Sequence, residues 1–238
     1  MHILLLETGA PPEELERKHG TYAAMFERLL APLERRFTFS ARKVFDNDPI
    51  PNPSEFDGLL ITGSPAGVYE GHDWISPTED LVRQTASLKI PQAGICFGHQ
   101  VMAQAFGGEV KKSTNGWGVG VHEYAVTEQL PWMTNPQRKL KCAVSHQDQV
   151  ITPPVGARVI AGSEFCENGA LSYAEGPAIS FQMHPEFAHE FALDLLSSRK
   201  GRIPDDRITQ GRATLQGASD RQLIANWMAS FFIQHQKR

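Results

Sequence analysis

The sequence predicts an α/β fold with an open, mixed but mainly parallel β-sheet that is flanked by helices. Two observations support this prediction. Over the first 106 residues, short apolar segments alternate with segments of helical periodicity, which is typical of parallel βαβ units. From about residue 110 to 183, short segments rich in Val, Ile, Tyr and Phe alternate with Gly/Pro turns, which indicates antiparallel strands or a mixed sheet edge.

The first 106 residues contain the elements of the predicted parallel part. Expected strands are short and either apolar or alternating in polarity: 2–7, 37–45, 56–64 and 90–96. Expected helices have apolar residues at helical spacing: 21–36, 76–89 and 97–106. The helix over 76–89 is expected to start with Ser76 as its N-cap, because Pro77 and Glu79 follow in a capping pattern.

The second half of the chain contains the expected antiparallel strands and two closing helices. The strand-like segments, all bounded by turn residues, are 119–127, 139–147, 157–163 and 169–183. Helical patterns cover 185–200 and 220–236. The stretch 201–219 between them is polar and Gly-rich, and is expected to be a loop or insertion before the C-terminal helix. Residues 1–238 are expected to form a single domain.

Length and composition exclude several classes of protein. The 238 residues carry a net charge of -4, which disfavours nucleic acid or an anionic membrane as a partner. Three cysteines, an odd and sparse number, disfavour a secreted disulfide scaffold. The start lacks the basic leader and long apolar run of a signal peptide, and no stretch is long enough to span a membrane. We therefore expect a cytoplasmic protein.

A cysteine stands where a predicted strand runs into a predicted helix. Gly94, Cys96 and Gly98 form a Gly-x-nucleophile-x-Gly pattern, in which a tight turn strains the central residue and needs small neighbours. The thiol would stand at the carboxyl edge of the sheet and at a helix N-terminus, which favours a thiolate. A buried structural cysteine would have the same pattern, so the choice depends on whether a base lies nearby.

A candidate base and its carboxylate partner follow another apolar strand. His184 comes directly after residues 178–183, and Pro185 separates it from Glu186, so one short loop could present both side chains. Glu186 would then fix the imidazole tautomer while the other ring nitrogen faces the thiol. The alternative is a metal site with His189, but a spacing of five does not stack two histidines on one helix face. No metal and no cofactor are expected.

Three segments together resemble the class I, triad-type glutamine amidotransferases, most closely the glutaminase domain of GMP synthase and its stand-alone relatives. The segments are LLITGSPAGVYE at 59–70, GICFGHQ at 94–100 and FQMHPEF at 181–187. They occur in the order and spacing of that family, and the resemblance extends over about residues 40 to 195. It implies a flavodoxin-like sheet and hydrolysis of an amide through a cysteine.

The resemblance assigns catalytic roles to individual positions. Cys96 would be the nucleophile, His184 the base and Glu186 its orienter. The oxyanion would be held by backbone N–H groups of the elbow and of the loop after residue 61, namely those of Phe97 and of Gly63 or Ser64. Ser64 stands where the family usually has glycine. If that position requires a positive φ, Ser64 is strained.

Three further positions are candidate substrate contacts. Gln100 matches the glutamine of the Cys-x-x-x-Gln pattern, which helps to hold the amino-acid end of the substrate. Ser145 and His146 lie in a segment, VSHQDQV, that resembles a pocket-lining segment of the family. For His146 and Asp148, a capped turn explains the pattern equally well.

Three functions are compatible with these patterns. The chain could be a glutaminase that hydrolyses glutamine to glutamate and ammonia, with the ammonia passing to a separate synthetase subunit, since it contains no P-loop. It could instead be a stand-alone γ-glutamyl peptidase, or a non-catalytic regulator on the same fold. The intact set of Cys96, His184 and Glu186 argues against the regulator. The expected ligand is glutamine or another γ-glutamyl compound.

Overall fold

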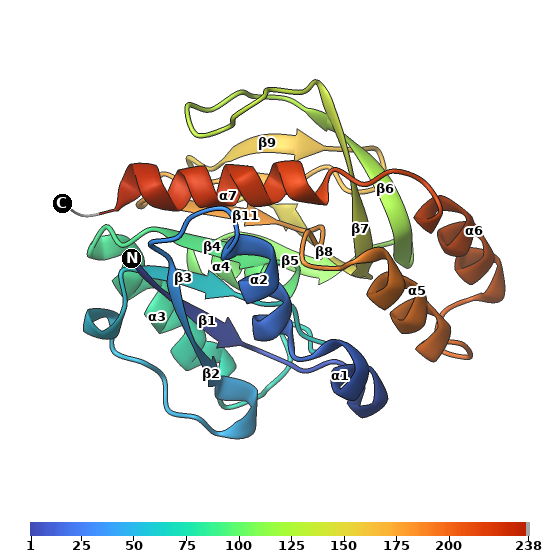
Figure 1. Cartoon of the computed structure of the whole chain (residues 1–238), viewed down its shortest axis with the longest axis horizontal. Helices are drawn as coiled ribbons and strands as arrows, with labels where there is room; N and C mark the ends of the chain where they lie inside the picture. The colour runs from blue at the N-terminus through green and yellow to red at the C-terminus, as the bar shows by residue number, and fades with distance from the viewer. Residues whose placement is uncertain (237–238) are drawn as a thin grey trace.

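A nine-stranded sheet forms the centre of residues 1–236, the part of the chain that the computed structural model describes (Figure 1). The strands in spatial order are β2 (Thr38–Lys43), β1 (His2–Glu7), β3 (Gly58–Ile61), β4 (Gln92–Ile95), β11 (Ala178–Phe181), β10 (Ala170–Ser172), β9 (Arg158–Gly162), β6 (Gly118–Val126) and β7 (Lys139–His146). A separate antiparallel pair joins β5 (Glu109–Lys112) to β8 (Asp148–Thr152). The sheet is open because its edge strands, β2 and β7, do not pair with each other.

The sheet has a parallel part and an antiparallel part, as the sequence predicted. The five strands from β2 to β11 run parallel, whereas β10, β9, β6 and β7 are joined by antiparallel pairs. The expected open, mixed, mainly parallel architecture is therefore confirmed. The last strand of the second half, β11, returns to pair with β4 and closes the parallel part.

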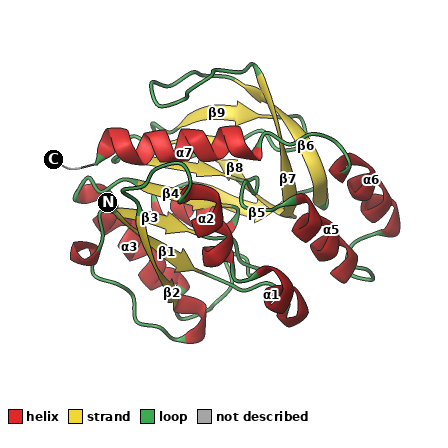
Figure 2. Cartoon of the chain, in the orientation of Figure 1, coloured by secondary structure: helices red, strands yellow, loops and turns green. Residues whose placement is uncertain are grey.

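Helices cover both faces of the sheet (Figure 2). Their bounds are α1 (Glu13–His19), α2 (Tyr22–Leu30), α3 (Ile75–Ser87), α4 (Phe97–Ala105), α5 (His189–Ser198), α6 (Asp205–Leu215) and α7 (Arg221–His235). None of the helices within residues 1–236 is both long enough and apolar enough to cross a bilayer.

Alternation along the strands divides the core between the two faces. Ile3 and Leu5 of β1 pack with apolar side chains of α2 and α7, whereas Leu4 and Leu6 pack with those of α3 and α4. All four side chains are buried, as expected for a parallel strand with helices on both sides. Each face thus buries its own apolar layer, and these layers hold the carboxyl ends of the strands in place.

Several predicted helix ends were wrong. The helix expected over 21–36 ends at Leu30, because Pro32 cannot continue it. The helix expected over 76–89 begins at Ile75, with Trp74 rather than Ser76 as its cap and no side-chain cap bond. The Trp74 carbonyl accepts from the Thr78 N–H, which places Ser76 inside the first turn.

The stretch 201–219 is not a loop, because it contains helix α6. The helix lies beside α5 and packs on β6 (Figure 1). Its Gly211 meets the backbone at Gly120, and the Thr214 hydroxyl accepts from the Val121 N–H at 2.9 Å. A helix that docks through a glycine and a hydroxyl shows little apolar periodicity, which is why the sequence pattern missed it.

Helix α1 was also missed by the sequence patterns. It buries none of its residues, so it lacks an apolar stripe. Its first turn is acidic and its last turn is basic, which complements the helix dipole. Lys18 near its end pairs with Glu190 and Asp194 of α5. Leu15 is the partly buried apolar residue of α1 that packs against the cluster around α5, so charges and one apolar contact together hold α1.

Candidate active site

Three neighbouring parallel strands bring the predicted catalytic residues to one edge of the sheet. Strand β4 pairs with β3 on one side and with β11 on the other. Cys96 directly follows β4, Gly63 follows β3, and His184 follows β11. Because the strands are parallel, all three residues lie at the carboxyl edge, where open α/β sheets bind ligands. Segments that are far apart in the chain thus meet around Cys96.

The backbone at Cys96 has the strained turn that the sequence predicted. Cys96 has a φ of 52° and directly precedes α4, and its N–H donates to the Phe181 carbonyl of β11 at 2.8 Å. A Cβ at Gly94 would overlap the Gly98 carbonyl, and one at Gly98 would overlap the Ile61 carbonyl of β3. Only glycines allow α4 to approach both strands this closely.

His184 and Glu186 form a buried pair beside the cysteine. The imidazole Nδ1 and a Glu186 carboxylate oxygen are 2.6 Å apart, and both side chains are almost fully buried. The Phe187 ring stacks on the imidazole with centroids 3.9 Å apart. Arg221 at the start of α7 donates to the Pro185 carbonyl at 2.9 Å. The contact between imidazole and carboxylate, the stacked Phe187 ring and the hydrogen bond from Arg221 together hold the turn from His184 to Glu186 in place.

The environment of His184 favours the charged imidazole. Burial alone would lower its pKa, but the Glu186 carboxylate and the neighbouring Cys96 raise the pKa to about 10. Nδ1 faces Glu186, which leaves Nε2 to interact with the thiol. Such a pair can hold a proton on the imidazole while the sulfur carries the negative charge.

Removing the carboxylate should therefore shift the pH dependence of catalysis. In Glu186→Gln the neutral amide no longer favours the charged imidazole, so the pKa of His184 falls and the imidazolium is lost at lower pH. We expect the alkaline limb of the kcat/KM profile for hydrolysis at Cys96 to move to lower pH. Glu14→Gln, an exposed change on α1, is the matched control. An unmoved alkaline limb in Glu186→Gln would contradict this role.

The loop after β3 lies against both the nucleophile and the base. A Cβ at Gly63 would stand 3.0 Å from Cε1 of His184 and 3.7 Å from Cβ of Cys96. Ser64 lines the same cavity as Cys96, and its φ is not positive, so the expected strain is absent. The loop also touches Gly9 after β1, where a Cβ would come within 2.6 Å of Pro65.

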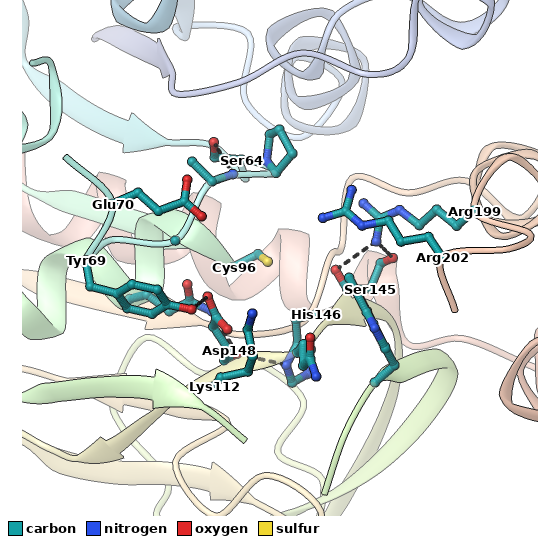
Figure 3. Close-up of a pocket in the computed structure, with 16 residues that line it drawn as sticks. Ser64, Tyr69, Glu70, Cys96, Lys112, Ser145, His146, Asp148, Arg199 and Arg202 are labelled. Atoms are coloured by element: carbon teal, nitrogen blue, oxygen red, sulfur yellow. Dashed lines mark hydrogen bonds between the residues drawn. The ribbon is translucent and has the colours of Figure 1, made fainter. Parts of the chain in front are cut away.

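A cavity opens in front of Cys96, and the three predicted substrate contacts line it. Figure 3 shows two of them, Ser145 and His146, beside Cys96. Gln100 lines the cavity, with its amide nitrogen donating to the Asp148 carbonyl at 2.9 Å. The Ser145 hydroxyl accepts from Arg199. His146 Nδ1 lies 3.1 Å from the Asp148 carbonyl. The structure thus brings Gln100, Ser145 and His146 together around the thiol. The contact between His146 and Asp148 also closes the turn at 146–148, as the alternative interpretation expected.

Two histidines near the site are neutral. Burial lowers the pKa of His146 to about 3, and in residues 1–236 its Nε2 has no hydrogen-bond partner. Burial likewise lowers the pKa of His99 to about 3, and its Nδ1 pairs with the Ser180 hydroxyl at 2.7 Å. His99 belongs to α4, and its buried side chain faces Ser180 of β11 rather than the cavity. His184 is therefore the histidine placed for proton transfer at Cys96.

His189 does not join His184 in a shared site. It begins α5 and faces a different cavity, lined by Val121 and Leu215. In residues 1–236, no group of three or more His, Cys, Asp or Glu side chains is arranged to hold a metal ion.

The cavity also contains charged and aromatic residues that sequence patterns did not indicate. Arg199 and Arg202 follow α5, and Trp117 precedes β6. Tyr69 donates to the Asp148 carboxylate at 2.9 Å. The arginines fall in or next to a segment without apolar periodicity, so no local signal distinguishes them from surface arginines. Both arginines line the cavity because the packing of α6 against β6 holds the turn between α5 and α6 beside it.

The chain matches known proteins over most of its length. A family model described as Glutamine amidotransferase class-I matches residues 26–195. One subunit of the glutamine-hydrolysing GMP synthase of Archaeoglobus fulgidus is 29% identical over 178 residues, which cover 74% of this chain and 90% of that protein. Gamma-glutamyl peptidase 4 of Arabidopsis thaliana is 26% identical over 221 residues, which cover 89% and 87%.

Solved structures show the same fold. The crystal structure of a glutamine amidotransferase from Thermotoga maritima has a TM-score of 0.78 with this chain at 19% sequence identity. The superposition covers 98% of this chain and 96% of that one. At this identity, the likeness shows the fold alone.

Proposed function

Since the chain belongs to the class I glutamine amidotransferase family, we propose that it is a cysteine hydrolase that cleaves the γ-amide of glutamine to glutamate and ammonia. The observation that carries the proposal is the meeting of Cys96, His184 and Glu186 at one sheet edge. The buried contact of 2.6 Å between His184 and Glu186 supports a nucleophile–base–orienter arrangement. The mechanism needs no cofactor.

In the first half of the reaction, Cys96 forms a thioester. The thiolate attacks the γ-carbonyl carbon, and the carbonyl electron pair moves onto the oxygen. Backbone N–H groups of Phe97 and of Gly63 or Ser64 stabilise this oxyanion. The C–N bond then breaks, the His184 imidazolium gives its proton to the departing nitrogen, and ammonia leaves. The γ-glutamyl group remains on the sulfur.

In the second half, water releases the product. Neutral His184 takes a proton from a water molecule, which attacks the thioester carbonyl. The same N–H groups hold the second oxyanion. The C–S bond breaks, glutamate leaves, and the thiolate and imidazolium are restored. Glu186 keeps the imidazole in the tautomer that serves both halves.

The direct test is turnover of glutamine by the purified chain. We expect glutamate and ammonia to appear in equal amounts, and a γ-glutamyl thioester at Cys96 to be trapped by acid quench and detected by mass spectrometry. Equal product without any adduct at Cys96 would contradict the covalent route. Absence of turnover, alone and after addition of a cell extract, would contradict the activity.

A stand-alone γ-glutamyl peptidase is the second candidate. The cavity extends from Cys96 to Trp117 and Arg202, which leaves room for an amine part larger than ammonia. The likeness to gamma-glutamyl peptidase 4 also covers most of both chains. Comparison of kcat/KM for glutamine and for γ-glutamyl dipeptides separates the two, since a glutaminase prefers glutamine.

A synthetase partner is a further part of the proposal for glutamine. The relative from Archaeoglobus fulgidus is named as one subunit of a GMP synthase, which supports a separate protein that accepts the ammonia. If this chain needs such a partner, a cell extract should raise its glutamine turnover. Turnover that is equally fast without extract would instead favour independent action.

A further inference from the structure

We propose that Arg199 and Arg202 bind a carboxylate on the amine side of the scissile γ-glutamyl amide. Besides glutamine, the site would then accept γ-glutamyl amino acids or peptides. This inference rests on the proposed hydrolysis at Cys96, and it assigns a specificity site to residues outside the catalytic set. Three observations support it: the convergence of the two guanidinium groups, their lack of acidic partners and their place relative to the thiol.

The two guanidinium groups converge on one indole ring. The Cζ atoms of Arg199 and Arg202 lie 5.6 and 5.5 Å from the centroid of Trp117. Cation–π contact of this kind orients a guanidinium while leaving its N–H groups free to bind an anion. All three side chains line the cavity that contains Cys96.

Neither arginine is neutralised by an acidic side chain. Within residues 1–236, no carboxylate comes within 4.0 Å of either guanidinium, whereas Arg17, Arg36, Arg42, Arg83 and Arg158 each form an ion pair. The hydrogen bonds of Arg199 go to the hydroxyl and carbonyl of Ser145, which leaves other N–H groups unused. Two adjacent cations repel each other, and a bound carboxylate would relieve that repulsion.

The other end of the cavity has the opposite chemistry. Glu70 and Asp148 line it, and Lys112 is the cross-strand partner of Asp148. Two carboxylates and an ammonium suit the charged amino and carboxylate groups of a γ-glutamyl moiety. Figure 3 shows Cys96 between this acidic end and the end formed by Arg199 and Arg202. A γ-glutamyl group bound at the acidic end would direct its amine part toward the arginines.

Binding to the inactive Cys96→Ala variant tests this inference without turnover. The probes are γ-glutamylglycine and γ-glutamylmethylamide, which share the γ-glutamyl group and differ in the carboxylate on the amine side. Calorimetry should show about tenfold tighter binding of γ-glutamylglycine, the expected gain from charge-assisted hydrogen bonds. Equal affinities, or no binding of either probe, would overturn the inference.

A second substitution identifies the groups responsible. Arg202 is exposed, so Arg202→Gln in the Cys96→Ala background should fold normally. It should reduce the preference for γ-glutamylglycine to about threefold or less, while the exposed control Arg35→Gln keeps it at about tenfold. If Arg202→Gln weakens both probes equally, the guanidinium holds the γ-glutamyl carboxylate instead and the inference is wrong.

The proposed function and this inference fail in different ways. Hydrolysis is judged by turnover in the wild-type chain, whereas carboxylate selection is judged by the affinity ratio in the inactive variant. A chain that shows the tenfold ratio without turnover would retain the carboxylate site and lose the hydrolase assignment. A chain that hydrolyses glutamine but binds both probes with equal affinity would retain the hydrolase assignment and lose the carboxylate site.

Discussion

Replacing Cys96 with alanine should abolish hydrolysis of glutamine and leave the fold intact. The substitution removes the nucleophile, and loss of one member of such a triad typically lowers kcat by at least about 10³-fold. The side chain is buried at 6% exposure but small, so the thermal midpoint should change little. Steady-state assay of ammonia release and a thermal melt measure the two effects.

The other two cysteines provide a matched control for this prediction. Cys142 and Cys166 are both buried, and burial raises the pKa of each thiol, which keeps it protonated. Cys142→Ala and Cys166→Ala should therefore retain turnover, and iodoacetamide should label Cys96 first. Turnover that survives in Cys96→Ala would exclude the thioester route.

Replacing Gly98 with alanine should strongly destabilise the fold. A Cβ at this position would overlap the carbonyl oxygen of Ile61 and would lie 2.9 Å from the carbonyl carbon of the same residue. Both atoms belong to the backbone of β3, so neither a rotamer change nor a side-chain shift relieves the clash. We expect a loss of about 3 kcal/mol, which lowers the thermal midpoint of a chain of this size by about 6 to 12 °C.

The same substitution should also reduce turnover, because α4 must move away from β3 and carries the Phe97 N–H with it. Gly71→Ala is the matched control, since a Cβ there meets nothing within 4 Å and its φ is not positive. Its melting temperature and kcat should equal those of the wild type. If Gly98→Ala behaves like Gly71→Ala, close approach of α4 to β3 is not required.

Most of the fold could be predicted because the spacing of apolar residues along the chain indicates which positions are buried. Strands such as β1 and β4 are short and apolar, and helices such as α2 have a one-sided apolar pattern, so local patterns suffice. Helix α6 could not be predicted because it docks through Gly211 and Thr214 on β6. Its contacts depend on the close approach of two backbones, which the spacing of apolar residues does not reveal.

The residues of the candidate site also fall into two groups, those that local sequence patterns indicate and those that they do not. Cys96, His184 and Glu186 stand in patterns that carry their own local signal: a thiol between two glycines, and a histidine and a glutamate on either side of a proline. Arg199, Arg202 and Trp117 have no such signal, because their meeting depends on how α5, α6 and β6 pack. The cationic end of the cavity therefore became visible only in the structure.

The sequence by itself determined the fold class and the three residues with catalytic patterns. Both follow from short-range constraints: burial sets the period of apolar residues, and a tight turn demands glycines beside Cys96. The tertiary structure decided which side chains share the cavity with the thiol, and it placed His99 in the core and the two arginines at the cavity. Pairing of strands and docking of helices over long chain separations set those positions, and no local pattern encodes them.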